Sequence, residues 1–354
     1  MSHHNVHEGF DKWTKALTGA LMDRGDCKTL AEVMELRNQG WGCNELDTVF
    51  QGGMNVVNTD RSPEHDVKWL PRMRESLCEM DTEMDFIKRV KRFIDISCGS
   101  GGYSTYIMQK CPLSTGVGIS YPVEEGGHVL EIAPNLLKRI EIHSERPTNF
   151  DLAPEMVKPE SPFPPFKPLP FKCQSFDMVV CSAQPLRPSP DTPNRPWNWE
   201  RILVSRLLMS LRAVSPGGTI FFRLSHPEGA VEARILLALG RVAGLVRTIK
   251  PKFVHSIRTS FYVIAQKVST DAEEYRALVH SLEKLWYIMS FEGENGYGRA
   301  VNWEEEEGIT PWGDVMSEDG IDTIARLGNP VWSTQSSALR KFLHAKGVRI
   351  RRPE

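Results

Sequence analysis

A dense run of glycines at the end of a short apolar stretch constrains this chain more than any other feature. Residues 92–104 read RFIDISCGSGGYS, in which strand-forming side chains precede Gly99, Gly101 and Gly102. Glycine tolerates positive φ and carries no side chain, so such a turn brings the backbone close to a ligand. The residues that follow, through Lys110, are typical of a helix, whose N-terminus attracts negative or polar groups. The stretch therefore predicts a strand, a ligand-binding turn and a helix of a doubly wound α/β fold.

The spacing of these glycines excludes two common nucleotide-binding motifs. They follow the pattern G-x-G-G, whereas a dinucleotide fingerprint requires G-x-G-x-x-G. A phosphate-binding loop would end in Gly-Lys-Ser or Gly-Lys-Thr, which this turn lacks. Asp95 lies inside the apolar run, where an acid has no packing role, and is therefore a candidate ligand-binding group. A strand–turn–helix corner without any ligand is the alternative.

Apolar stretches alternate with helical periodicity beyond the turn. Strands are expected at residues 116–120, 138–143, 176–181, 219–224 and 261–267, and helices at 200–214 and 229–244. Continuous apolar strands that alternate with helices predict a mostly parallel sheet covered on both faces. The helix at 200–214 is expected to stop at Ser215-Pro216-Gly217-Gly218. Residues 1–67 and 269–354 are predicted to form helical extensions around a domain at 68–268.

Composition and charge limit the functions that the chain can have. The 354 residues carry a formal net charge of −2, so nucleic acid would have to bind a local patch. The candidate patches are the segment Arg234–Arg258 and the basic C-terminal tail with Arg340, Lys341, Lys346, Arg349, Arg351 and Arg352. No apolar run approaches the roughly 20 residues that span a bilayer, so no membrane partner is expected. The cysteines form no C-x-x-C pair and predict a reduced intracellular protein, cytoplasmic or nuclear, without a metal site.

The segment DISCGSGGYS, from Asp95 to Ser104, resembles the first motif of the FtsJ-like (RrmJ) methyltransferases and of the related mRNA-cap 2′-O-methyltransferases. That motif reads D-x-x-x-x-P-G-G-F/W-S, and Ser100 stands where proline is usual. The strand FDMVVC at 176–181 and the helix–Pro-Gly-Gly–strand segment resemble further parts of the family. The resemblance covers roughly residues 68–268 and implies a Rossmann-like fold with S-adenosylmethionine (SAM) as cofactor.

The resemblance also implies which residues contact the cofactor. The turn would supply Asp95, Gly99, Ser100, Gly101, Gly102 and Tyr103. Many SAM enzymes have an acid at the end of the second strand, where this chain has Ser120. Glu124 and Glu125 follow closely and either bond the ribose or form a charged loop. Asn149 and Asp151 are the candidates for binding the adenine amino group.

The FtsJ-like group is known for a Lys-Asp-Lys-Glu tetrad around the acceptor hydroxyl. When the chain is aligned with the family's segments, these positions fall on Lys68, Ser182, Arg223 and Ser260. The last three of these differ from the family's residues, so three of the four are replaced. Arginine cannot act as a base, because its pKa lies above about 12. The replacements predict that ribose 2′-O-methylation by the usual mechanism is slow or absent. His226 and His255 are the other titrating groups that would be available as bases.

Two functions therefore stay open. The chain is either an active SAM-dependent methyltransferase acting on a small molecule or an atypical RNA, or a catalytically weakened SAM-binding module of an RNA-related complex. Trp197 and Trp199, in the loop after the fourth strand, either stack on a planar substrate or pack against the next helix.

Overall fold

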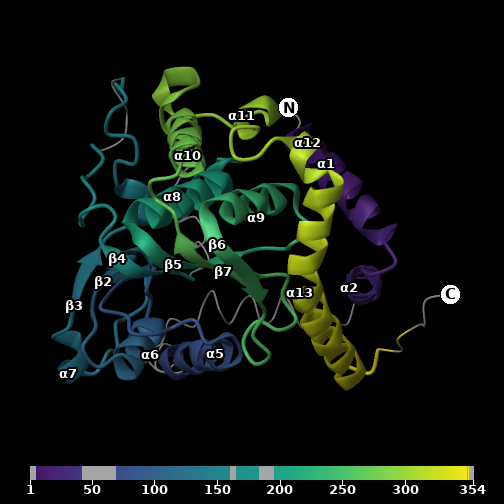
Figure 1. Ribbon diagram of the computed structural model, residues 1–354, viewed down its shortest axis with the longest axis horizontal. Helices are drawn as coiled ribbons and strands as arrows, with labels where there is room; N and C mark the ends of the chain where they lie inside the picture. Colours follow the sequence, from purple (N-terminus) through teal and green to yellow (C-terminus); the bar gives the residue numbers. More distant parts are fainter. Residues whose placement is uncertain (1–4, 42–68, 160–164, 183–194, 349, 351–354) are drawn as a thin grey trace.

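Figure 1 shows the computed structural model, which describes residues 5–41, 69–159, 165–182, 195–348 and 350. Its centre is a seven-stranded sheet in the order β3-β2-β1-β4-β5-β7-β6. The strands are β1 Arg92–Ile96, β2 Thr115–Ser120, β3 Ile140–Ser144, β4 Phe176–Cys181, β5 Val214–Leu224, β6 Ala243–Ile249 and β7 Phe261–Val268. Strands β1 to β5 pair in parallel, and β7 runs antiparallel to both β5 and β6. The prediction of a mostly parallel sheet is confirmed.

Helices cover both faces of this sheet, as a doubly wound fold requires (Figure 1). One face carries α5 Trp69–Met84, α6 Gly102–Lys110 and the short α7 Pro134–Leu137, and the other carries α8 Asn198–Ala213, α9 Ala230–Val242 and α10 Glu273–Phe291. Every residue of β1 from Phe93 to Ile96 is buried because side chains pack on both faces of the strand. The fold class predicted from strand–helix alternation is therefore confirmed.

The segment Ser215–Gly218 differs from its prediction. Helix α8 does end before it, at Ala213, but the Pro-Gly-Gly residues belong to the first part of β5 instead of to a separate turn. The pairing of β5 with β4 shifts register between Phe176 and Met178, which is the irregularity of a bulge. Gly217 has φ of 76°, a conformation that glycine adopts at little cost.

The N- and C-terminal helices pack together beside the β6 edge of the sheet. Helices α1 Asn5–Met22, α2 Lys28–Trp41 and α13 Glu318–Ala345 share a separate core that also takes in Ala233 of α9 (Figure 1). The shorter helical turns are η1 Val123–Glu125, η2 Pro147–Asn149, η3 Glu294–Gly296, α11 Trp303–Glu306 and α12 Trp312–Val315. The division of the chain at residues 67 and 268 stays a prediction. None of the described helices combines the length and the apolar character needed to cross a membrane.

A buried ion pair links both extensions to the sheet domain. Glu228, after β5, is 2% exposed and accepts hydrogen bonds from Arg37 of α2 at 2.7 Å and from the Trp332 indole of α13 at 2.8 Å. Arg37 also donates to Gln335 of α13 at 2.9 Å, and Gln335 in turn donates to the carbonyl of Ile257 at 3.3 Å. Helix α13 thus contacts the loop between β6 and β7 directly, and α2 contacts Glu228 after β5.

Candidate active site

The glycine turn connects β1 to α6 at the carboxyl edge of the parallel strands, as predicted. Gly99 and Gly101 have φ of 55° and 90°, in the left-handed region that favours glycine. A Cβ on Gly101 would lie 2.3 Å from Cγ1 of Ile132, and one on Gly102 would lie 2.6 Å from the carbonyl oxygen of Leu70. The turn is therefore glycine-rich both for its backbone conformation and for the close packing of neighbouring segments.

Asp95 lies beneath this turn and is fully buried. Its Oδ2 accepts a hydrogen bond from the Ser104 hydroxyl at 2.7 Å. Burial raises the pKa of the Asp95 carboxyl to about 7, against the opposing effect of the Ser104 hydrogen bond. Its Oδ1, together with the Ser97 and Thr105 hydroxyls, has no hydrogen-bond partner within the described part of the chain. Buried polar atoms usually have hydrogen-bond partners, so these three, next to the N–H groups at the N-terminus of α6, fit a polar ligand such as SAM.

Tyr103 joins this turn to the strands on the other side of β4. Its side chain is 2% exposed, and its hydroxyl lies 2.9 Å from that of Tyr262 on β7. The Tyr262 ring stacks on Phe221 of β5 with ring centroids 4.7 Å apart. Burial raises the pKa of the Tyr103 hydroxyl well above its usual value, so it is a neutral hydrogen-bonding group. The Tyr103 side chain therefore belongs to the packing between the turn and strands β5 and β7.

The residues expected to bind the adenosine part lie after β2 and β3. Ser120 ends β2 and is 7% exposed. Asn149 donates to Glu145 at 2.6 Å, and the Asp151 carboxylate accepts from Lys158 at 2.6 Å. Glu125 pairs with Arg146. Because these polar groups already have partners, their contacts with a cofactor stay a prediction.

The structure brings together the three described tetrad positions. Arg223 of β5 donates to the Ser260 hydroxyl at 2.7 Å and approaches the carbonyl oxygen of Ser182 at 3.4 Å. Strand pairing explains the meeting, because β5 lies between β4, which Ser182 follows, and β7, which Ser260 precedes. Lys68 lies outside the described residues. Among the described residues, no carboxylate pairs with Arg223, and its Nε is a buried donor without a partner.

Lys250 is a buried cation beside this cluster that was not predicted from the sequence. Its Nζ donates to the carbonyl oxygens of His255, Arg258 and Ser260 at 3.2, 2.6 and 2.8 Å, although the residue is only 2% exposed. Burial, together with Arg223, lowers its pKa to about 7. Lys250 thus holds the loop between β6 and β7 in shape, including His255, whose φ of 60° is unusual for a residue with a side chain. A lysine at the end of an apolar strand was the available sequence signal.

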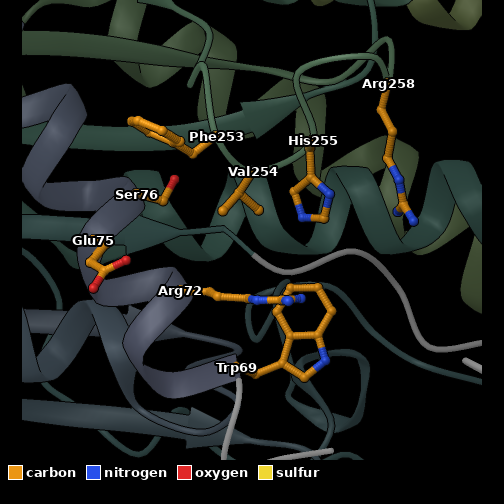
Figure 2. Close-up of a pocket in the computed structure, with 8 residues that line it drawn as sticks. All are labelled: Trp69, Arg72, Glu75, Ser76, Phe253, Val254, His255 and Arg258. Atoms are coloured by element: carbon orange, nitrogen blue, oxygen red, sulfur yellow. The ribbon is translucent and has the colours of Figure 1, made fainter. Parts of the chain in front are cut away.

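A pocket of about 430 Å³ opens between this loop and the N-terminal part of α5. It is lined by Trp69, Arg72, Glu75, Ser76, Phe253, Val254, His255 and Arg258 (Figure 2). The close-up shows the side chains of Arg72, His255 and Arg258 directed into the same space, with Trp69 below them and Glu75 further along α5. The pocket is therefore bordered by cationic and aromatic groups from two separate parts of the chain.

Neither the two histidines that were candidate bases nor the buried cysteine thiols are suited to removing a proton from a methyl acceptor. Burial and the neighbouring cations lower the pKa of His255 to about 3, so its imidazole is a weak base. His226 lies 3.7 Å from Glu232 and does not line the pocket. Burial raises the pKa of the Cys98 thiol well above its usual value and that of Cys181 to about 12. No group of three His, Cys, Asp or Glu side chains suited to a metal ion occurs in the described ranges.

Two further predictions are modified by the structure. The basic segment Arg234–Arg258 does not form a continuous surface, because Arg234 and Lys250 are buried, and Arg234 donates to the carbonyl of Glu306 at 3.0 Å. Trp197 precedes α8, and its indole N–H donates to the carbonyl of Met289 at 3.3 Å. Trp197 therefore packs against a helix, and its ring is not a surface on which a substrate stacks. Trp199 in the first turn of α8 is 54% exposed.

Comparisons with known proteins place these features in context. A putative ribosomal RNA methyltransferase of Plasmodium falciparum has 17% identity and a TM-score of 0.39, over 56% of this chain and 97% of that one. CalO1, a methyltransferase in calicheamicin biosynthesis solved with S-adenosylhomocysteine (SAH), has 14% identity and a TM-score of 0.32 over 64% and 59% of the two chains. Phosphoethanolamine N-methyltransferase 1 of Haemonchus contortus, also with SAH, has 11% identity and a TM-score of 0.37 over 70% and 54%. No curated protein sequence matches at a significant level.

The family comparison is decisive. The model of the FtsJ-like methyltransferases matches residues 74–268, which is more than half of the 354 residues. That span runs from within α5 to the end of β7 and includes the glycine turn, Asp95, and Arg223 with its partners Ser182 and Ser260. The cofactor expected from the first motif, SAM, is the methyl donor of these enzymes. The chain therefore belongs to the FtsJ-like methyltransferase family.

Proposed function

We propose that this chain transfers the methyl group of SAM to an acceptor that the protein does not have to deprotonate. The observation that carries the proposal is the contact of Arg223 with Ser260 and the Ser182 carbonyl, at positions where the family has a lysine and two acids. A guanidinium stays protonated and orients a substrate, but it cannot remove a proton from a hydroxyl. His255, with a pKa of about 3, does not replace the missing base at neutral pH. Lys250, whose pKa burial lowers to about 7, already directs its Nζ to three carbonyl oxygens of its own loop.

Each part of the site has a distinct role in this proposal. SAM, when bound, supplies an electrophilic methyl group on a positively charged sulfur. The glycine turn and Asp95 hold the cofactor, since backbone approach and orphaned polar atoms coincide there. Arg223 orients the acceptor, and Lys250 keeps the β6–β7 loop in place around it. Aligning two reactants in this way is a large part of the rate enhancement that such a displacement needs.

A second candidate function is a catalytically weakened SAM-binding module. The lack of any carboxylate partner for Arg223 among the described residues favours it, because a charge network that raises hydroxyl reactivity is missing. Such a module would act in an RNA-related complex, for which the basic C-terminal tail is the remaining candidate contact. Arg340 of that tail already pairs with Glu32.

Calorimetry with SAM and SAH, followed by turnover with methyl-labelled SAM, separates the two functions. We expect both nucleosides to bind, and label to pass from SAM into a small-molecule extract. Gly101→Asp should abolish the heat of SAH binding, because it forces a charged side chain into the space occupied by Ile132. Gly240→Ala on the exposed side of α9 is the control and should bind SAH normally. Binding without transfer to an extract or to RNA would support the weakened module, and no heat with the folded protein would refute both.

A further inference from the structure

We infer that Arg201 is a cofactor-binding residue, whose guanidinium donates hydrogen bonds to the ribose oxygens of SAM. This inference rests on the proposed function and adds a binding residue to the same site. Three observations carry it: a buried guanidinium nitrogen without a partner, the place of Arg201 beside the end of β2, and the pairing of the polar groups that were predicted to bind the adenosine part.

The guanidinium of Arg201 is partly buried and uncompensated. Arg201 lies in the first turn of α8, where its backbone N–H donates to the carbonyl of Trp197 at 3.0 Å. Its Nε is buried and has no hydrogen-bond partner in the part of the chain that the structure describes. Burial and the neighbouring Arg195 lower the pKa of Arg201 to about 10, and only Tyr121 opposes that shift. A donor that has lost its hydration without gaining a partner is completed by a ligand atom that accepts a hydrogen bond.

The packing of α8 places Arg201 at the edge of the sheet where the adenosine part is expected. Helix α8 packs against β1, β4 and η2. Val204, almost one turn further along α8, shares a core with Phe150, which directly follows η2. Tyr121 directly follows β2 and is close enough to act on the charge of Arg201. The start of α8 therefore lies beside the segments that follow β2 and β3.

The end of the second strand is where doubly wound folds bind the ribose of a nucleotide ligand, often through an acid that accepts from the ribose hydroxyls. This chain has Ser120 and Tyr121 at that place. A ribose hydroxyl can also accept a hydrogen bond, and a guanidinium has five N–H donors and no acceptor. Arg201 would therefore bind the same hydroxyls as an acid does, with the direction of the hydrogen bond reversed.

The other polar groups near this place are already engaged within the protein. Asn149 donates to Glu145 at 2.6 Å, and Asp151 accepts from Lys158 at 2.6 Å. A ligand that used these groups would have to break an existing hydrogen bond, whereas the Nε of Arg201 gives up nothing.

Calorimetry of SAH binding to the full chain and three variants tests the assignment. Arg201→Met keeps the length of the side chain and removes its donors, so it should weaken SAH binding about 10- to 100-fold, the range for a hydrogen bond from a charged group. Arg201→Lys keeps the charge with a different donor geometry and should recover part of that loss. Arg212→Met, at the other end of α8, removes an arginine that is paired with Glu283 and should leave SAH binding unchanged.

Deoxy analogues of SAH locate the contact on the ribose. The 2′-deoxy and 3′-deoxy analogues each lack one hydroxyl, and at least one of them should bind the unmodified chain more weakly than SAH does. For that analogue Arg201→Met should cause no further loss, because the oxygen that the guanidinium contacts is already absent. An equal loss from Arg201→Met with SAH and with both analogues would overturn the ribose contact.

The stability of the SAM-free protein separates binding from a structural role. Because the Nε of Arg201 has no partner in the chain, Arg201→Met should not lower the free energy of unfolding in urea. A loss of stability, unchanged SAH affinity, or inorganic phosphate that displaces SAH from the unmodified chain but not from Arg201→Met would overturn the inference, the last by identifying an anion site. Failure of the unmodified chain to bind SAH refutes the proposed function, whereas SAH binding that is independent of Arg201 refutes only this inference.

Discussion

Replacing Gly101 by alanine tests how the cofactor turn is built. Gly101 combines φ of 90° with a Cβ direction that points at Ile132, where the added atom would lie 2.3 Å from Cγ1 and 2.6 Å from Cδ1. Real side chains do not approach so closely, so either the turn or Ile132 must shift. We therefore expect two costs, one from the backbone conformation and one from overpacking.

Substitutions of two other glycines by alanine separate these two costs. A side chain in the left-handed region costs about 1–2 kcal/mol, and overpacking a core typically costs about 1–3 kcal/mol. Gly101→Ala should therefore lower the free energy of unfolding by about 2–5 kcal/mol. Gly217 has φ of 76° but no atom within 4 Å of its added Cβ, so Gly217→Ala should show only the first cost. Gly240 lies in helix α9 and also has no atom within 4 Å of an added Cβ, so Gly240→Ala should slightly raise the free energy of unfolding.

Urea denaturation of the three variants measures these differences, and a double mutant isolates the contact. Ile132→Ala removes the two closest atoms that Gly101→Ala would meet and leaves only Leu130 Cδ1 at 3.3 Å. Gly101→Ala should therefore be less costly in that background by about 1–3 kcal/mol. If Gly101→Ala costs no more than Gly217→Ala, or if the Ile132→Ala background changes nothing, the packing argument is wrong.

The remaining predictions concern buried charges. Burial raises the pKa of Asp95 to about 7 in the folded protein, so between pH 4 and 7 the folded chain holds a proton at this carboxyl that the unfolded chain has lost. The free energy of unfolding of the SAM-free protein should therefore fall as pH rises through that window. The loss should reach up to about 4 kcal/mol, at ~1.4 kcal/mol per pKa unit. Asp95→Asn should flatten this profile, and an identical pH dependence in the variant would contradict the assignment. Glu228→Ala leaves the half-buried Arg37 without its carboxylate partner and should cost about 3–5 kcal/mol, whereas Glu32→Ala at a surface pair should cost less than about 1 kcal/mol. Equal losses in urea denaturation would argue against a role of the Glu228 pair in holding the extensions to the sheet domain. Lys250→Met should raise hydrogen exchange in residues 251–260 and cost about 1–3 kcal/mol, with Lys252→Met as control, and unchanged exchange would show that the loop keeps its shape without the ammonium.

Local patterns were enough to predict the framework of the site. The run from Phe93 to Ile96, the glycines after it and the helix through Lys110 form as expected, because strand, turn and helix preferences act between residues close in sequence. Register from family segments also identified Ser182, Arg223 and Ser260, which do meet. The three residues meet because each position lies at the end of a strand, and the ends of neighbouring strands share one edge of the sheet. Their role in the reaction stays a prediction.

Other features depend on contacts between distant segments. Nothing in the local pattern places Arg234 in the interior, where the carbonyls of residues 306 and 310 accept hydrogen bonds from its Nη1. The prediction of a basic surface was therefore wrong for that residue. Nor did the local pattern show that Trp69 and Arg72 of α5 would face the loop that carries Phe253 and Arg258.

By itself, the sequence determined that a glycine turn follows an apolar strand, since that is a statement about residue types at fixed spacing. The resemblance to the family added the prediction that three of the four tetrad residues are replaced. Only the tertiary structure decided which cations share one site and how far burial lowers the pKa of Lys250 and His255. The reason is that desolvation and charge–charge interaction depend on the distance in space between groups, which spacing along the chain does not specify.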